Sequence, residues 1–241
     1  MRYFIHLAYD GTRYHGWQIQ PNGISVEGEI EHCLSTIVRQ DIDIIGAGRT
    51  DAGVHARHMV AHFDCTPLDC NQLKYRLNRM LPPDIIIYKV EEVSDEMHAR
   101  FSATKRTYHY YLHTQKSPFH RHFSWECHFN LDFEKMNEAA SLLLEYNDFA
   151  CFCKSHTDVK TTLCEITEAR WIIQDNNTAY FRISANRFLR NMVRAIVGTL
   201  IEVGRGRMTI DEFRSVIEGK KRTQAGESMP AHALFLEKID Y

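Results

Sequence analysis

The sequence has no apolar run long enough for a signal peptide or a membrane span, and no low-complexity segment or close internal repeat. Its 7 cysteines are an odd number in a chain without a secretory segment, so we expect reduced thiols and a cytoplasmic, soluble protein. Hydrophobic residues make up 44% and charged residues 25% of the 241 residues, which argues against disorder, a collagen-like repeat and a coiled coil. A globular chain of this length forms one large domain or two modest ones.

The net charge of -2 gives no overall indication of a nucleic-acid partner, but this total is an average over unlike segments. Residues 186–222 contain nine Lys and Arg against four Asp and Glu, whereas residues 131–175 contain nine acidic residues against four basic ones. Because the two segments cancel, the near-neutral total is compatible with a basic surface that faces a nucleic acid.

The first half of the chain alternates strand and helix patterns. Strands are predicted at residues 2–9, 42–45, 59–63 and 85–93, with a helix that Ser25 can cap and a second helix at 71–80 that Pro82-Pro83 stops. The order is β-α-β-β-α-β.

The second half repeats this order with one helix added. Strands are predicted at residues 106–112, 166–173, 179–184 and 234–239, and helices at 133–144, at 188–203 and after a capping box of Thr209 and Glu212. This order is that of the ferredoxin-like split unit, whose antiparallel sheet also serves RNA-binding modules. We therefore predict an α+β fold of two ferredoxin-like (βαββαβ) halves, residues 1–103 and 104–241, with a catalytic cleft between them. The boundary has no Pro/Gly/Ser linker, so we expect the halves to pack firmly.

The Gly-rich run GAGRTDAGVHA at residues 46–56 places an acid, Asp51, after a strand, between glycines and beside Arg49. The glycines permit positive φ and a close backbone approach, and Arg49 can pair with Asp51 and keep it ionised. The alternative is a β-turn in which the aspartate only caps the backbone. The run lacks the third glycine of a dinucleotide loop and the Gly-Lys-Ser/Thr of a P-loop.

One cluster has the residue types of a metal site: Cys151, Cys153, His156 and Cys164. The Cys-x-Cys spacing is tighter than the pairs of structural zinc sites, and no second cysteine pair follows. Buried reduced thiols are the better interpretation, and we predict no metal.

The run GRTDAGVHA resembles the signature loop of the tRNA pseudouridine synthases of the TruA type. Five further blocks resemble the same family in the same order, namely YDGTRYHGWQIQ (9–20), LNRMLPPDI (77–85), HARFSATKRTYHYYL (98–112), NDFACF (147–152) and NRFLRNMVRAIVGTLIEVGRG (186–206). The resemblance implies isomerisation of uridine to pseudouridine at positions 38, 39 and 40 of the tRNA anticodon stem-loop, with the target base flipped out of the helix. It also implies that no cofactor is needed and that the protein is a homodimer.

The resemblance assigns roles to particular residues. Asp51 would be the nucleophile, at uracil carbon 6 or ribose carbon 1′, or would first act as a base at the sugar. Arg194 would be the cation that pairs with Asp51, and Arg49 is the alternative partner or a phosphate contact. Without the family, Arg194 is equally an arginine that extends from an apolar helix to water.

Tyr108 corresponds to the tyrosine that would stack on the flipped uracil. In an alternating strand Tyr108 and Tyr110 share one face and Tyr111 the other, so at least one of the three is structural. Tyr14, Trp17 and Gln18 are candidates to line the RNA groove, with a core role for Trp17 equally open, and His55 and His58 are expected to order the loop. Candidate phosphate contacts, against the alternative of a solvated polar face, are Arg100, Lys105, Arg106, Arg187, Arg190, Arg205 and Arg207.

Two other functions compete with this interpretation. A non-catalytic RNA-binding module would have no need for Asp51, Arg194 and Tyr108 together. A carboxylate-dependent hydrolase of a small nucleotide would need a metal or a second acid near Asp51, and the sequence offers no convincing one.

Overall fold

The computed structural model describes residues 1–154 and 160–241, which form two compact units. One unit consists of Met1–Thr104 together with Phe235–Tyr241, and the other of Lys105–Leu234. The break near residue 104 lies one residue beyond the expected boundary. The division differs from the expected one at the C-terminal end, because the last strand groups with the first unit. The described residues form nine strands and five α-helices, a mixed α/β structure.

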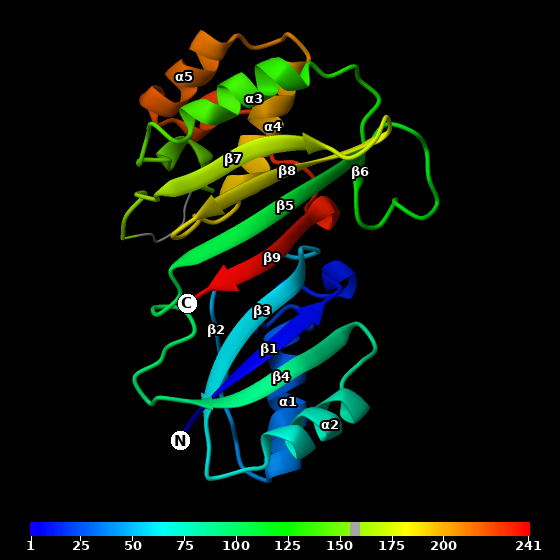
Figure 1. Cartoon of the computed structure of the whole chain (residues 1–241), viewed down its shortest axis with the longest axis vertical. Helices are drawn as coiled ribbons and strands as arrows, with labels where there is room; N and C mark the ends of the chain where they lie inside the picture. The colour runs from blue at the N-terminus through cyan, green and yellow to red at the C-terminus, as the bar shows by residue number, and fades with distance from the viewer. Residues whose placement is uncertain (155–159) are drawn as a thin grey trace. The chain divides into compact units, whose positions relative to one another are not determined.

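The first unit is built around three long strands. Its elements are β1 (Arg2–Tyr9), η1 (Gly11–Arg13), α1 (Val26–Val38), β2 (Ile45–Gly46), β3 (His55–Asp64), α2 (Cys70–Met80), β4 (Ile85–Val93) and most of β9 (Leu234–Asp240) (Figure 1). Strand β1 pairs antiparallel with both β3 and β4, and β2 pairs antiparallel with β3. Strand β9 pairs in parallel with the first two residues of β3, and this pairing brings the C-terminal strand into the first unit.

Helix α1 begins where the sequence predicts it. The Ser25 side chain accepts a hydrogen bond from the Gly28 N–H at 3.1 Å, which satisfies one of the unpaired donors of the first turn. Val26, Ile30 and Leu34 form its buried face, at the spacing of an amphipathic helix. Helix α1 packs against α2, and α2 packs along β4.

Strand β2 is shorter than the predicted strand at 42–45. The Ile42 N–H donates to Ser35 Oγ at 3.0 Å, and the Ile44 N–H donates to Glu31 Oε1 at 2.8 Å. Both acceptors are side chains of α1. Because these backbone donors are used by the helix, only Ile45 of the predicted strand joins the ladder, together with Gly46 beyond it.

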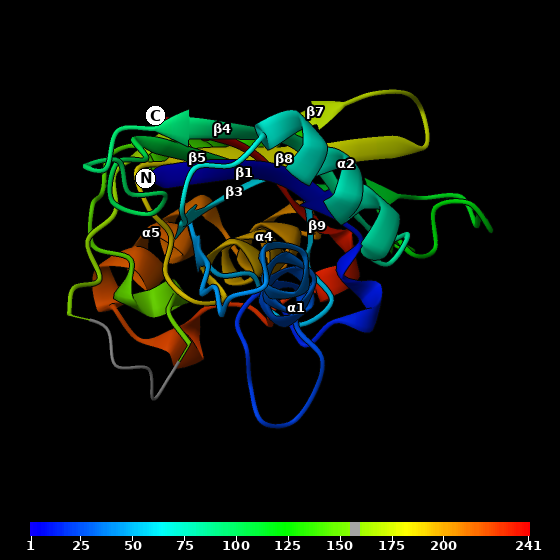
Figure 2. The same cartoon turned by 90° about the horizontal axis from the view of Figure 1, so that it is seen from below.

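The second unit has an antiparallel sheet of β5, β8 and β7 in that order, with β6 parallel to β5. Its elements are β5 (Lys105–His113), β6 (Trp125–Glu126), α3 (Phe133–Leu142), η2 (Ala150–Phe152), β7 (Ile166–Ile173), β8 (Thr178–Ala185), α4 (Met192–Gly204), α5 (Ile210–Gly219), η3 (Arg222–Gln224) and η4 (Ala231–Ala233). Helix α3 contacts β7, α4 and α5, and Figure 2 shows α4 on one face of β5 and β8.

Helix α4 starts at Met192, later than the predicted residue 188. Asn191 precedes it with a φ of +66°, a left-handed conformation that a continuous helix cannot contain. Helix α5 begins with the predicted capping box, in which Thr209 and Glu212 each bond the other's backbone N–H. In the described ranges, no helix has both the length and the apolar character needed to cross a membrane.

Candidate active site

Residues 46–54 connect β2 to β3 and are called the Asp51 loop below. They are held by residues 9–17, the clamp segment. The Trp17 N–H donates to the Thr50 carbonyl at 3.2 Å, and the hydroxyls of Tyr9 and Thr50 share a buried hydrogen bond of 2.8 Å. Both contacts fall on the residue directly before Asp51. The position of the acid is therefore set by tertiary contacts as well as by the local turn.

The turn that follows Asp51 depends on one glycine. The Val54 N–H donates to the Asp51 carbonyl at 3.1 Å, and Gly53 between them has a φ of +75°, which favours glycine. The Gly53 N–H also donates to the Tyr14 carbonyl at 3.3 Å, a second link to the clamp segment. The sequence suggests two reasons for a glycine in this loop, a positive φ and a close backbone approach. Neither applies at Gly48, where φ is not positive and a Cβ would meet open space.

Asp51 is half-buried and its neighbour Arg49 is exposed. In the part of the chain that the structure describes, no salt bridge joins Arg49 to Asp51, so the predicted pairing within the loop is not formed. The positive charge of Arg49 instead favours the ionised form of Glu27 in α1. Burial raises the pKa of Glu27, while hydrogen bonds from the Ile19 N–H and the Trp17 indole, together with the charge of Arg49, oppose that rise.

His55 fixes the C-terminal end of the loop. The side chain is 1% exposed, and its Nδ1 accepts a hydrogen bond from the Gly11 N–H at 3.0 Å and lies 3.1 Å from Asp10 Oδ1. The ring stacks on Phe235 of β9 with centroids 4.5 Å apart. The expected loop-ordering role of His55 is confirmed.

Two aromatic residues of the clamp segment are buried. Tyr14 is 3% and Trp17 is 1% exposed, so the prediction that they line an RNA groove is wrong. The Trp17 indole donates to Glu27 Oε1 at 3.1 Å, which agrees with the alternative of a core anchor. Gln18, the third predicted groove residue, directly follows the clamp segment and is exposed.

Asp84 supports the clamp segment, a role that the sequence analysis missed. Its carboxylate accepts hydrogen bonds from the Tyr14 hydroxyl at 2.6 Å and from Arg13 Nε at 2.7 Å. Burial alone would raise the pKa of Asp84, but the bonds from Arg13 and Tyr14 outweigh it and hold that pKa below its usual value. The sequence contains one indication of this role, namely an acidic residue directly after the helix-ending pair Pro82-Pro83.

The three tyrosines of β5 have different surroundings. Tyr110 is fully buried, which confirms that at least one of them is structural. Tyr111 lies on the opposite face, where its ring is 5.5 Å from that of Tyr180. Tyr108 is half-buried and meets Phe188 edge-on, with ring centroids 5.1 Å apart. Of the two tyrosines on the shared face, only Tyr108 keeps part of its ring exposed.

Arg194 lies in the first turn of α4 and is half-buried. Its Nε donates to the Met229 carbonyl at 2.6 Å, and the Met229 N–H donates to the Arg194 carbonyl at 3.2 Å. Burial raises the pKa of Tyr110, and the charge of Arg194 opposes that rise. The positive charge of Arg194 therefore lies near enough to Tyr110 to affect its pKa, on the face of β5 that Tyr108 and Tyr110 share.

The segment at residues 186–191, between β8 and α4, gathers several predicted RNA contacts in the second unit. Arg106 Nη1 donates to the Asn186 carbonyl at 2.7 Å, and Phe188 of the same segment contacts Tyr108. The segment also carries the predicted contacts Arg187 and Arg190. The segment that carries Arg187 and Arg190 and bonds Arg106 therefore contacts Tyr108 through Phe188.

Other predicted phosphate contacts have local partners. The Arg100 guanidinium lies 5.7 Å from the ring centroid of Phe101 in the first unit. Arg205 pairs with Glu202 at 2.9 Å and covers the ring of Phe129 at 3.8 Å, so a structural role accounts for its position. Lys105 and Arg207 are exposed.

The candidate metal cluster falls partly outside the described residues, since His156 lies there. Cys151, Cys153 and Cys164 are buried free thiols, and burial raises the pKa of Cys151 to about 12 and that of Cys164 to about 11. Within residues 1–154 and 160–241, no group of three or more His, Cys, Asp or Glu side chains is arranged to hold a metal ion.

Comparison with known proteins identifies the class of enzyme. A family model described as tRNA pseudouridine synthase matches residues 5–102 and 139–241. The chain belongs to the tRNA pseudouridine synthase family and is an isomerase.

Three relatives, each called tRNA pseudouridine synthase A, match along nearly their whole length. The relative from Bacteroides fragilis is 57% identical over 100% of this chain and 96% of its own. Those from Chlorobaculum tepidum and Bacillus subtilis are 42% and 38% identical, over 98% and 100% of this chain and 96% and 99% of theirs. The predicted family is confirmed.

Proposed function

We propose that this chain isomerises uridine to pseudouridine at positions 38, 39 and 40 of the tRNA anticodon stem-loop, with Asp51 as the nucleophile. The observation that carries the proposal is the environment of Asp51 in a chain of this family. The acid is half-buried, and the residue before it is held to the clamp segment by the Trp17 N–H and the Tyr9 hydroxyl. A nucleophile held in place before substrate arrives avoids part of the entropic cost of reaction.

The reaction rearranges bonds within one nucleotide. The bond between ribose carbon 1′ and uracil N1 breaks, and a bond between carbon 1′ and uracil carbon 5 forms. Carbon 5 loses a proton and N1 gains one, so product and substrate have the same atoms and no electrons are exchanged with a redox partner. A carboxylate that bonds covalently to uracil carbon 6 or to ribose carbon 1′ would divide this exchange into easier steps. Proton abstraction from the sugar is the third role open to Asp51.

Arg194 is the proposed charge partner of Asp51. A carboxylate in a site that excludes water needs a cation to stay ionised, and a cation within about 4–6 Å typically lowers its pKa by about 1–3 units. The bond from Arg194 Nε to the Met229 carbonyl limits the orientations of the guanidinium. Arg49 is exposed and is proposed to contact a phosphate.

Tyr108 is proposed to stack on the target uracil after the nucleotide is flipped out. A stacked base is worth about 1–3 kcal/mol, which offsets much of an unpairing cost of a few kcal/mol. Arg106, Arg187 and Arg190, which lie near Tyr108, are proposed to contact the RNA backbone, as is Arg100 of the first unit.

The larger organisation of the enzyme is also a proposal. Two ferredoxin-like halves are supported by the order of strands and helices and by the antiparallel pairing of β1, β3 and β4 and of β5, β8 and β7. We further propose a cytoplasmic homodimer that acts on tRNA without a cofactor.

The test is pseudouridine mapping on an unmodified tRNA transcript. The wild-type chain is expected to place pseudouridine at positions 38 to 40, and Asp51→Ala and Asp51→Asn to lose at least 1,000-fold in single-turnover rate, because a nucleophile is removed (on the order of 4 kcal/mol). Asp41→Asn, the same chemical change at an exposed residue outside the loop, is the control.

Each outcome bears on one part of the proposal. Folded wild-type protein that forms no pseudouridine would exclude the activity on this substrate. Pseudouridine at other positions would exclude the assigned site in tRNA. Full activity in Asp51→Asn would exclude the nucleophile, and a normal rate of the chemical step in Arg194→Leu would exclude its charge partner.

A further inference from the structure

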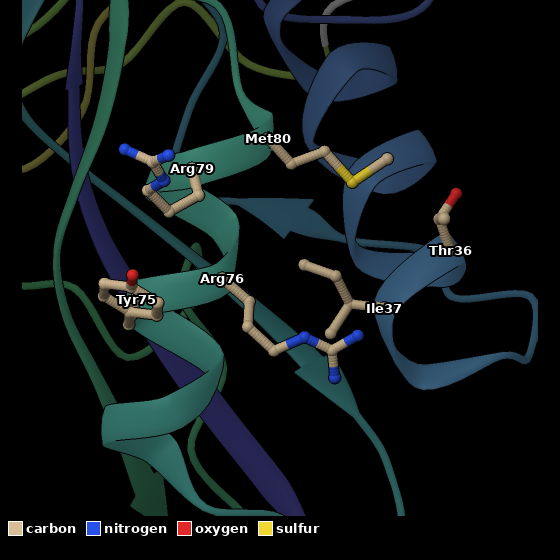
Figure 3. A pocket seen from close by; sticks show the side chains of 6 residues that line it. All are labelled: Thr36, Ile37, Tyr75, Arg76, Arg79 and Met80. Atoms are coloured by element: carbon tan, nitrogen blue, oxygen red, sulfur yellow. The ribbon is translucent and has the colours of Figure 1, made fainter.

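A groove of about 440 Å³ lies between α1 and α2 in the first unit, away from any residue given a role above. It is lined by Thr36 and Ile37 of α1 and by Tyr75, Arg76, Arg79 and Met80 of α2 (Figure 3). On α2, Arg76 and Met80 extend toward α1, whereas Tyr75 and Arg79 point away from α1. At positions 75, 76, 79 and 80 the four side chains occupy adjacent places on one face of the helix.

The charge of α2 is uncompensated. From Cys70 to Met80 the helix carries Lys74, Arg76 and Arg79 and no acidic residue. Among the residues that the structure describes, no carboxylate lies within salt-bridge distance of these three cations. Arg170 and Arg214 of the second unit, by contrast, each pair with a glutamate. Arg76 and Arg79 are three positions apart and therefore neighbours on the helix surface, an arrangement that disfavours the helix unless an anion is bound.

The apolar groups of the groove are unusually exposed. Tyr75 is 67% and Met80 is 41% exposed, although a surface helix normally turns such side chains inward. The favourable charge of a helix C-terminus accounts for Arg79 in the last turn but not for Lys74 or Arg76. An exposed aromatic ring beside cations is a combination that binds nucleic acid, because phosphates pair with the cations and bases or riboses pack on the ring.

We infer that this groove is a second RNA-binding surface, which takes the sugar-phosphate backbone of the tRNA with Tyr75 against a base or ribose. The inference rests on the proposed function, since that function supplies the polyanion. A second copy of this chain fits the groove less well. A two-fold contact would place Arg76 and Arg79 against the same residues of the other copy, and like charges would then oppose association.

The test measures binding of a full-length unmodified tRNA transcript between 50 and 200 mM salt. The double variant Arg76→Gln/Arg79→Gln is expected to bind about 10- to 30-fold more weakly, and the slope of log K against log salt is expected to become about 1.4–1.8 less steep, as for two lost phosphate contacts. Arg76→Lys/Arg79→Lys keeps both charges and is expected to keep the slope. Tyr75→Ala is expected to weaken binding at every salt concentration without changing the slope, and Tyr75→Phe to bind as wild type.

The matched control is Arg170→Gln/Arg214→Gln, which removes two charges that already face Glu168 and Glu145. It is expected to change the slope by less than 0.5. An unchanged slope in Arg76→Gln/Arg79→Gln, with pseudouridine still formed by wild-type protein, would overturn the groove alone. Binding that depends on the groove in a chain that forms no pseudouridine would overturn the proposed function alone. Any change in oligomeric state in Arg76→Gln/Arg79→Gln would assign the groove to a second copy and overturn the inference.

Discussion

Gly16 lies where the clamp segment crosses the Asp51 loop, and its backbone leaves no room for a side chain. Its φ is +95°, and a Cβ at this position would overlap the carbonyl oxygen of Thr50. The same carbonyl accepts the Trp17 N–H. A substitution here therefore displaces the residue next to Asp51 without changing the chemistry of the carboxylate.

Gly16→Ala is expected to lower the free energy of unfolding by roughly 3 kcal/mol, because backbone strain and overpacking each cost about 1–3 kcal/mol. The single-turnover rate is expected to fall at least 10-fold, because the loop must move away from the new methyl group. Urea denaturation and pseudouridine formation measure the two effects. Gly206→Ala is the control, since Gly206 has a φ of +68° but open space around its Cβ position. A loss of activity as large in Gly206→Ala would contradict the explanation.

Tyr108 and Tyr111 differ in the face of β5 that they occupy, and this difference provides a second test at the residue scale. Tyr108→Ala is expected to lose roughly 10- to 100-fold in single-turnover rate, from a stacking term of about 1–3 kcal/mol. Tyr108→Phe keeps the ring and is expected to lose less. Tyr111→Ala on the opposite face is expected to remain near wild type. Equal losses in Tyr108→Ala and Tyr111→Ala would mean that the ring of Tyr108 acts through the stability of the sheet.

At the scale of elements, the short strand β2 pairs with β3 at a buried histidine of β3, His62. His62 pairs with Ile45 of β2 in the ladder, is 3% exposed and accepts the Ala99 N–H at 3.2 Å. Burial, together with the smaller effect of the nearby charges of His98 and Arg2, lowers the pKa of His62 to about 4. The strand that leads into the Asp51 loop therefore depends on a histidine that stays neutral in the folded state.

This histidine gives the stability a defined pH dependence. The unfolded chain protonates His62 near pH 6.5, whereas the folded chain does so only near pH 4. Its stabilising contribution is therefore complete above pH 6.5 and is lost as the pH falls toward 4, by at most about 1.4 kcal/mol per pH unit. Urea denaturation between pH 7 and 4.5 should show a smaller loss of stability in His62→Gln than in wild type. His128→Gln, at an exposed histidine, should follow the wild-type curve, and a parallel curve for His62→Gln would exclude this origin.

The lengths of β2 and α4 also illustrate how elements depart from sequence patterns. Residues 42–44 have the composition of a strand, but side chains of α1 take two of their backbone donors. Phe188 and Leu189 extend the apolar pattern of α4 toward the N-terminus, but Asn191 adopts a left-handed conformation, so the helix begins only at Met192. Hydrophobic periodicity reports which side of an element is buried, and it contains little information on where hydrogen bonding begins or ends.

At the scale of the whole molecule, opposite charges are segregated along the chain. The nine basic and four acidic residues of 186–222 include Arg187, Arg190 and Arg194, near the tyrosine proposed to stack on uracil. The acidic excess of 131–175 covers α3 and β7. A near-neutral total therefore does not weaken the case for an RNA substrate, because an RNA meets a local surface and not an average.

The proposed homodimer is tested on the full chain by sedimentation equilibrium. At micromolar concentration the mass is expected to be that of two chains, because a tRNA is large enough to be gripped by one subunit and modified by the other. The stoichiometry of tRNA bound per chain, measured in the same experiment, checks this reason. A monomer that forms pseudouridine at the wild-type rate would show that one chain is sufficient.

The sequence by itself determined the family, the order of strands and helices apart from the two-residue strand β6, and the caps at Ser25 and Thr209, because these depend on residues a few positions apart or on motifs that are contiguous in the chain. Only the tertiary structure decided which β5 tyrosine keeps an exposed ring, that Tyr14 and Trp17 are buried, and that Arg49 does not pair with Asp51. Each of these depends on contacts between distant residues, such as the bond from Tyr9 to Thr50 across 41 positions. Burial and hydrogen bonding at such positions are set by the packing of whole elements, which local patterns do not encode.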